Sequence, residues 1–254
     1  MTTVSYILEA TCLRPVEQTG KKQLDTNVNS VVAINRRARS AEQKAQRRQA
    51  VLEAAETHFL DVGYEAFSMT QLAKKSGVVK GTLYLYFKTR EELFLTLYEQ
   101  SLIRWSQVFI GYLSDSMTSE TYARALYNTA VADGTFLPLL IRLEHVIEHN
   151  VAIPRLIESK RVFITQVEVV AKATSTSLKL SKAQATEVVK TMGVLLIGAM
   201  GADQGPSLVN EELPDDVQDL IASFASEPLF VRNVVRIIEG IRAEATPTSS
   251  QKFS

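Results

Sequence analysis

The most explicit chemical pattern in the chain is the run His145-Val146-Ile147-Glu148-His149. On an α-helix, histidines four positions apart share one face, and with the glutamate between them they form the inverted zinc-peptidase pattern. A working site would need a third protein ligand, for which neighbouring glutamates are available. A five-residue match also arises by chance, and histidines are independently favoured at a helix end by the helix dipole. We interpret these histidines as ordinary surface or pocket residues, with a zinc-dependent hydrolase or a regulatory metal site as alternatives.

A second pattern lies in residues 80–87 and concerns which side chains share a helix face. At about 100° per residue, Leu83 and Phe87 lie together and would pack against Leu72 and Phe59. The opposite face carries small or apolar groups, namely Gly81, Thr82 and Leu85, flanked by Tyr84 and Tyr86. A solvated helix would carry Lys, Glu or Gln there, whereas these groups can touch thymine methyls and sugar edges, and tyrosines can reach phosphates. This face therefore favours contact with DNA over binding of a protein helix.

The helices that must position residues 80–87 can be located from the capping motifs at which helices begin. A Ser or Thr followed three residues later by Gln or Glu has capping-box spacing, which recurs at Ser40, Ser68 and Thr89. The patterns predict a first helix from Ser40 to Gly63, a short second helix over 68–75, a third over 80–87 and a long fourth helix from Thr89. Because a tight Ser-Gly turn joins the second and third helices, the pair predicts a helix-turn-helix.

The composition of the 254-residue chain is that of a globular protein, with 46% apolar and 22% charged residues. The one cysteine, Cys12, cannot form an intramolecular disulfide and fits a reducing compartment. No apolar run approaches the roughly 18 residues of a membrane span, and the start of the chain lacks the pattern of a signal peptide. Strand signals are nearly absent. These features predict a cytoplasmic all-α protein without a membrane partner.

The charges are distributed unequally along the chain. Residues 36–90 contain 11 Lys and Arg against 5 Asp and Glu, a net charge of +6, whereas residues 91–254 contain 14 against 20, a net charge of −6. Only the first segment is therefore expected to meet a polyanion. The predicted parts are a flexible arm over 1–39 with a basic end, a helix-turn-helix domain over 40–90, a helical domain over 91–245 and a disordered tail over 246–254. The basic end, residues 36–39, is either a solvated cluster or an arm that follows the minor groove or phosphates.

Residues 63–93, above all the run Gly-Thr-Leu-Tyr-Leu-Tyr-Phe-Lys at 81–88, resemble the DNA-binding module of the TetR family of bacterial transcriptional regulators. The resemblance implies a homodimer whose third helix enters the major groove of a palindromic operator. It implies that nine residues face DNA: Ser68, Thr70, Lys80, Gly81, Thr82, Tyr84, Tyr86, Lys88 and Arg90. The helix wheel adds Leu85 to this set. Lys88 and Arg90 would neutralise phosphates, although Arg90 could instead pair with Glu91 or Glu92. One departure is Val79, where the family usually has Ser, Thr or Ala, because a valine side chain cannot cap a helix.

The remainder of the chain predicts a larger helical domain for dimerisation and ligand binding. Helices are expected over 120–133, 136–149, 155–177, 182–201 and 228–244, with an irregular or short helical stretch over 204–214. Small residues in 187–201 permit close helix approach, so this helix is interpreted as a subunit interface, with an ordinary buried core helix as the alternative. The apolar stripe of the last helix would complete a dimer bundle, which the last two helices usually supply in the family. A ligand pocket is expected between the fourth helix and the next three, lined by Trp105, Phe109, Tyr122, Phe136, Leu140, His145 and Phe163.

These observations predict a dimeric DNA-binding regulator rather than an enzyme. The resemblance implies a repressor that a small-molecule effector releases from its operator. No catalytic residue, metal ligand or cofactor is assigned. Two alternatives stay open at this point: a zinc-dependent hydrolase that uses His145, Glu148 and His149, and a non-specific architectural DNA binder.

Overall fold

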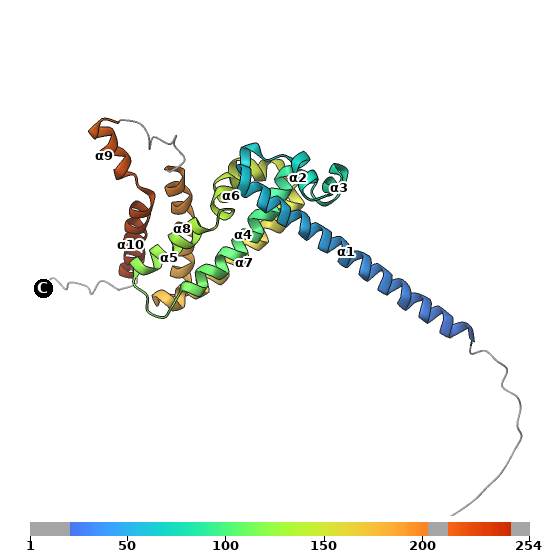
Figure 1. The fold of residues 1–254 in the computed structure, drawn as a ribbon. Helices are drawn as coiled ribbons and strands as arrows, with labels where there is room; N and C mark the ends of the chain where they lie inside the picture. The colour runs from blue at the N-terminus through green and yellow to red at the C-terminus, as the bar shows by residue number, and fades with distance from the viewer. Residues whose placement is uncertain (1–20, 203–212, 245–254) are drawn as a thin grey trace, which may run out of the picture. The chain divides into compact units, whose positions relative to one another are not determined.

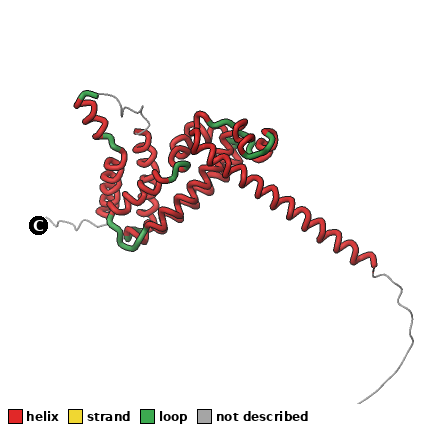
Figure 2. Tube along the Cα trace, in the orientation of Figure 1, coloured by secondary structure: helices red, strands yellow, loops and turns green. Residues whose placement is uncertain are grey.

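The computed structural model describes the backbone of residues 21–202 and 213–244. Every regular element in these two ranges is a helix (Figures 1 and 2), which confirms the all-α prediction. The α-helices are α1 (Lys21–Ala66), α2 (Met69–Lys75), α3 (Lys80–Tyr86), α4 (Arg90–Tyr112), α5 (Ser119–Ala132), α6 (Phe136–Arg142), α7 (Ile153–Leu178), α8 (Lys182–Ala202), α9 (Asp215–Ser223) and α10 (Ser226–Glu244). A π-helical turn η1 (Leu143–Ile147) and a 3-10 turn η2 (Glu148–Asn150) connect α6 to α7.

Helix α1 corrects the sequence prediction at its start. We expected a flexible arm up to residue 39 and a helix from Ser40, but the helix begins at Lys21. Residues 21–62 contain neither proline nor glycine, and the Asn- and Ser-rich stretch that resembled a linker costs at most about 0.7 kcal/mol per residue in a helix. The basic run at 36–39 is therefore helical backbone rather than part of a flexible arm. Residues 1–20 and the expected tail lie outside the described residues.

The chain forms two units, one up to Gln49 and one from Ala50 onward. Within the second unit, α1 ends at the predicted glycine. Gly63 has φ 72°, a left-handed conformation that favours glycine, and only a short helical continuation reaches Ala66. Ser68 Oγ then accepts a hydrogen bond from the Thr70 N–H at 3.3 Å and starts α2.

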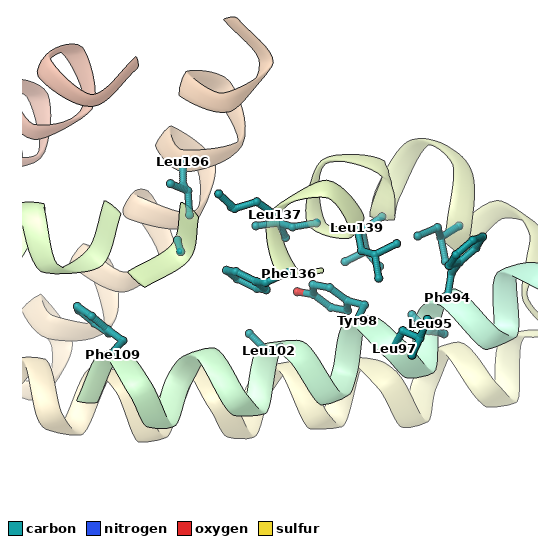
Figure 3. Packing of buried hydrophobic residues seen from close by; sticks show 14 of the residues in the cluster. Phe94, Leu95, Leu97, Tyr98, Leu102, Phe109, Phe136, Leu137, Leu139 and Leu196 are labelled. Atoms are coloured by element: carbon teal, nitrogen blue, oxygen red, sulfur yellow. The ribbon is translucent and has the colours of Figure 1, made fainter. Parts of the chain in front are cut away.

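Helix α4 forms the centre of the second unit. Its residues from Glu92 to Tyr98 are all buried, and the helix packs against α5, α6 and α7. Figure 1 shows α4 and α7 side by side, and α8 packs in turn on α7 and on α10. Figure 3 shows the apolar side chains gathered between α4, α6 and α8, with Tyr98 and Leu102 next to Phe136 and with Leu196 above them. This core extends from the helix-turn-helix to the larger bundle.

Two further differences concern the helices of the bundle. The helix expected over 136–149 is divided, because α6 ends at Arg142 and the chain continues through η1 and η2. Helix α9 was not predicted, although Pro214 before it and two aspartates in its first turn are ordinary helix-start signals. The stretch expected to be irregular lies mostly in residues 203–212, outside the described residues.

Candidate DNA-binding surface and effector cavity

The turn between α2 and α3 sets the position of the third helix. Ser76 ends α2, where its N–H and Oγ both donate to the Leu72 carbonyl oxygen at 2.8 and 2.7 Å. Gly77 follows with φ 67°, and the Val78 N–H donates to the Ala73 carbonyl oxygen at 3.1 Å. This hydrogen-bonded left-handed turn is the usual way to end one helix and start another at an angle. It fixes the direction in which α3 leaves the domain.

The buried face of α3 is the one that the helix wheel predicts. Leu83 is 0% exposed, and Phe87, which caps the end of α3, is also buried. Leu72 and Phe59 belong to the same buried cluster. Burial of these side chains leaves the other face of α3 free to contact a partner.

The exposed face of α3 carries the residues predicted to contact bases. Leu85 is 79% exposed and Tyr84 is 42% exposed, whereas Thr82 and Tyr86 are half-buried. Gly81 and Lys80 are exposed at the start of the helix. Val79, at the start of α3, is also 77% exposed, so several apolar side chains are exposed together here, as on a binding surface. Base contact by these residues remains a prediction.

The residues at the start of α3 and around it differ in how far their side chains are exposed to solvent. Val79 is exposed, and it forms no side-chain cap because valine has no hydrogen-bonding group in its side chain. Thr70 and Lys88 are exposed, whereas Ser68 is half-buried because it caps α2. These positions fit phosphate contacts along the edge of the surface.

Arg90 differs from the other predicted DNA contacts. Its Nε donates to Glu91 Oε1 at 3.2 Å, and its guanidinium lies 4.7 Å from the centre of the Tyr64 ring and 5.5 Å from that of Phe94. A cation stacked on two aromatic rings and paired with a carboxylate already has its interactions inside the protein. The structure therefore favours pairing of Arg90 with Glu91 over contact with a phosphate.

The fourth helix is anchored directly after this surface by a reciprocal cap. Thr89 Oγ1 accepts from the Glu92 N–H at 3.0 Å, and Glu92 Oε2 accepts from the Lys88 N–H at 2.7 Å. These two bonds satisfy amides that the start of a helix leaves free. The backbone of Lys88 is thereby held in place while its side chain remains exposed.

A cavity of about 190 Å³ lies in the larger bundle, between α4, α6, η1, α7 and α8. Most of its wall is apolar, and polar groups stand at only a few points. Of the seven predicted pocket residues, four line this cavity: Trp105, Phe136, Leu140 and Phe163. Trp105 and Phe136 stack with ring centres 4.7 Å apart at an angle of 10°.

Three predicted pocket residues lie elsewhere. Phe109 and Tyr122 are 0% exposed and form an edge-on pair at 5.4 Å, where α4 and α5 pack directly and leave no space. The Tyr122 hydroxyl is also satisfied by Thr174 Oγ1 at 2.8 Å. His145 is exposed on η1, outside the cavity lining. None of the three lines this cavity, because Phe109 and Tyr122 fill a helix contact and His145 is exposed outside it.

Sequence reasoning missed Tyr98 and the contribution of α8. Tyr98 lies seven residues before Trp105, and therefore on the same face of α4, so the spacing itself points to it. Met192 and Leu196 of α8 also line the cavity, but the predicted pocket contained no residue of that helix, which was interpreted as a subunit interface or a buried core helix.

The histidine pattern does not form a cluster of metal ligands in the structure. His145 lies in the π turn and His149 in the 3-10 turn, so the two do not have α-helical spacing, and both are exposed. Glu148 Oε1 is instead paired with Lys160 Nζ at 2.6 Å. Among the described residues, no group of three His, Cys, Asp or Glu side chains is placed to hold a metal ion. No helix in the same ranges is long and apolar enough to cross a lipid bilayer.

A polar network connects the cavity region to α1. Arg104 Nη2 donates to Glu56 Oε1 of α1 at 2.7 Å, and Arg104 Nε donates to Asp133 Oδ2 at 3.0 Å. Thr135 Oγ1 donates to the same Glu56 oxygen at 2.8 Å. Gly134 lies so close to Leu60 of α1 that a β-carbon there would be 2.8 Å from Leu60 Cδ2. The turn that leads into Phe136 is thus held directly against the first helix of the helix-turn-helix.

A helix-turn-helix with an exposed third helix, followed by a helical bundle that encloses a cavity, is an arrangement of DNA-binding transcriptional regulators. Residues 51–97 match the family of bacterial regulatory proteins described as the tetR family, and residues 99–245 match the tetracyclin repressor-like C-terminal domain. The chain therefore belongs to the TetR family of transcriptional regulators.

Two relatives from Bacillus subtilis agree with this assignment over part of the chain. An uncharacterized HTH-type transcriptional regulator, YhgD of Bacillus subtilis, is 41% identical over 82 residues, which are 32% of this chain and 43% of that protein. The fatty acid metabolism regulator protein of the same bacterium is 32% identical over 60 residues, 24% of this chain and 31% of that protein. The match covers less than half the length of each of these relatives.

The solved structure of the multidrug binding protein EbrR, complexed with imidazole, resembles the fold. It has a TM-score of 0.51 and 18% identity, over 80% of this chain and 97% of that one. At this identity the likeness concerns the fold alone.

Proposed function

We propose that this protein is a homodimeric repressor that binds a palindromic operator through α3 and leaves it when a small molecule occupies the cavity between α4, α7 and α8. The observation that carries the proposal is the exposed face of α3. Tyr84 and Leu85 point away from the core, and the turn at Gly77 holds their helix in a fixed direction. Side chains of this kind distinguish bases in the major groove, where thymine presents a methyl group.

A homodimer is supported by the packing of α8 and α10. These two helices pack against each other, and α8 leaves a valine and a glycine exposed one turn apart, Val194 and Gly198. Small and apolar residues on an exposed helix permit close approach of the same helix from a second copy around a two-fold axis. Two copies would present two α3 helices to the two half-sites of a palindrome.

Release by an effector requires a connection from the cavity to the DNA-binding helices. Phe136 forms part of the cavity wall, and its N–H donates to Asp133 Oδ1 at 2.9 Å. Asp133 is bound to Arg104, and Arg104 holds Glu56 of α1. A ligand that displaces Phe136 would therefore strain bonds that position α1. The effector must bind more tightly to the conformation in which the two α3 helices no longer match the groove spacing.

The proposal is tested by selecting bound duplexes from a random DNA pool with the full-length protein. We expect an inverted repeat, occupied by two chains per duplex, as measured by light scattering of the complex. A scrambled duplex of the same composition, measured at the same salt concentration, is the control. Equal affinity for the two duplexes would identify a non-specific architectural binder and refute the proposal.

A further inference from the structure

The wall of the cavity contains a buried polar group that no other described residue satisfies. Tyr98 is only 1% exposed, and its hydroxyl has no hydrogen-bond partner in the described ranges. Buried hydroxyl groups nearly always have a hydrogen-bond partner, which is a protein group or an ordered water molecule. In Figure 3 the Tyr98 hydroxyl points away from α4 toward the side of Phe136, and both residues line the cavity. The free hydroxyl is therefore a binding group within the cavity wall.

The aromatic rings next to this hydroxyl form a nearly parallel series. Tyr98 and Phe136 have ring centres 6.2 Å apart at 14°, and Phe136 and Trp105 are 4.7 Å apart at 10°. These separations are those of offset stacks, in which each ring leaves part of its face uncovered. Such a wall favours a flat aromatic molecule that adds to the series.

The charges around the hydroxyl restrict the group that it can bind. Burial, together with the nearby carboxylates of Glu148, Glu99 and Glu144, holds the pKa of the Tyr98 hydroxyl well above its ordinary value. The hydroxyl therefore keeps its proton and can donate it to an acceptor on a bound molecule. Two of these carboxylates are already paired with cations, Glu148 with Lys160 and Glu99 with Arg155, each at 2.6 Å. The third, Glu144, lines the cavity and would repel an anionic acceptor. A neutral acceptor, such as a carbonyl oxygen or a ring nitrogen, fits this position best.

The volume limits the size of the molecule. The cavity of about 190 Å³ is somewhat larger than an engineered apolar cavity of about 150 Å³ that binds benzene. The volume of the cavity therefore corresponds to a compound of one or two fused rings.

We propose that the effector is a small, planar, uncharged aromatic compound of one or two rings, whose neutral carbonyl oxygen or ring nitrogen accepts a hydrogen bond from the Tyr98 hydroxyl. This inference rests on the proposed function, because it assumes that the cavity is the effector site. It gives the effector a chemical class and makes Tyr98 the residue that selects for the acceptor.

The test uses three two-ring compounds of similar size: coumarin, which is neutral and has a carbonyl oxygen, naphthalene, which has no acceptor, and 1-naphthoate, which is an anion. Trp105 is the single tryptophan of the chain and lies in the cavity wall, so quenching of its fluorescence reports binding without DNA. We expect coumarin to bind most tightly. Tyr98→Phe, which removes only the hydroxyl, should weaken coumarin about five- to tenfold and leave naphthalene unchanged.

The matched control is Tyr112→Phe, which makes the same change at an exposed position of the same helix and should leave all three affinities unaltered. Thermal unfolding of Tyr98→Phe verifies that the variant is folded, which is expected because the removed hydroxyl has no partner. Equal binding of coumarin to the wild type and Tyr98→Phe, tighter binding of 1-naphthoate, or absence of quenching by coumarin would each overturn the inference.

Operator binding is measured separately, so that the two proposals can fail independently. If coumarin binds through Tyr98 but does not change operator affinity, the ligand class stands and release by an effector is wrong. If an operator is selected but coumarin does not bind, the DNA-binding proposal stands and the ligand class is wrong.

Discussion

Leu83 and Leu85 lie two positions apart on α3 and provide a matched pair of substitutions. Leu83 is 0% exposed and lies in the core, whereas Leu85 is 79% exposed. Leu→Ala removes the same atoms at both positions, so any difference in stability arises from burial alone. For a fully buried leucine the loss is about 2–5 kcal/mol, because the lost burial is added to the cost of the cavity left behind. For an exposed leucine the change is within about 0.5 kcal/mol.

A loss of about 3 kcal/mol is a large part of the roughly 5–15 kcal/mol that stabilises a typical protein. At roughly 2–4 °C per kcal/mol for a protein of this size, Leu83→Ala should lower Tm by about 6–12 °C. Leu85→Ala should leave Tm nearly unchanged and should alter the preference among operator sequences. Circular dichroism melting and urea unfolding measure the first effect, and binding to selected duplexes measures the second. If Leu85→Ala unfolds the domain and Leu83→Ala does not, α3 is rotated about its axis and the assigned DNA-facing residues are wrong.

Three further predictions concern the same domain. Tyr84→Ala should weaken specific operator binding by about 1–3 kcal/mol and affect scrambled DNA much less, whereas equal losses on both would exclude base reading by Tyr84. Lys88→Ala should make the slope of log affinity against log salt concentration shallower by roughly 1.8, which is about 0.9 for each of two phosphates contacted by a dimer. Arg90→Ala should leave this slope unaltered, because Arg90 is paired with Glu91. A shallower slope for Arg90→Ala would identify Arg90 as a phosphate contact. His58 is buried against Phe67, and burial followed by the charge of Lys75 lowers its pKa below 6.5. The His58 imidazole therefore binds a proton more readily in the unfolded chain than in the folded protein. Its contribution to the free energy of unfolding is complete above pH 6.5 and decreases as the pH falls from 6.5 toward the pKa of His58 in the folded state. His58→Phe should reduce that decline in urea unfolding, and an identical pH profile for the variant would assign the decline to other groups.

The local features of the DNA-binding domain could be predicted from the sequence because they depend on residues close together in the chain. The spacing of Leu83 and Phe87 sets which face of α3 is buried, and the glycines at 63 and 77 mark the two left-handed positions. The cap at Thr89 follows from a glutamate three residues later. Each of these features requires only helix periodicity or a single turn, so no knowledge of distant contacts is needed.

The helix before Ser40 shows where local reasoning was insufficient. Asn and Ser are common in linkers, and their frequency over residues 25–30 suggested one. Helix formation over a long segment depends on the sum of many small preferences and on the absence of Pro and Gly, rather than on a few weak helix formers. A window as long as the whole segment 21–62 would have favoured the helix that the structure contains.

The effector cavity was decided by tertiary structure. The sequence identified the large aromatic residues of α4, α5 and α6, but it could not distinguish those at a helix contact from those beside a gap. Phe109 and Tyr122 fill the contact between α4 and α5, whereas Trp105 and Phe136 border the cavity. That difference depends on the angles and separations at which α4, α7 and α8 pack, and α4 is far from α7 and α8 along the chain. The free hydroxyl of Tyr98 arises for the same reason, because only the packed bundle determines which buried polar groups find a partner and which are left facing the cavity.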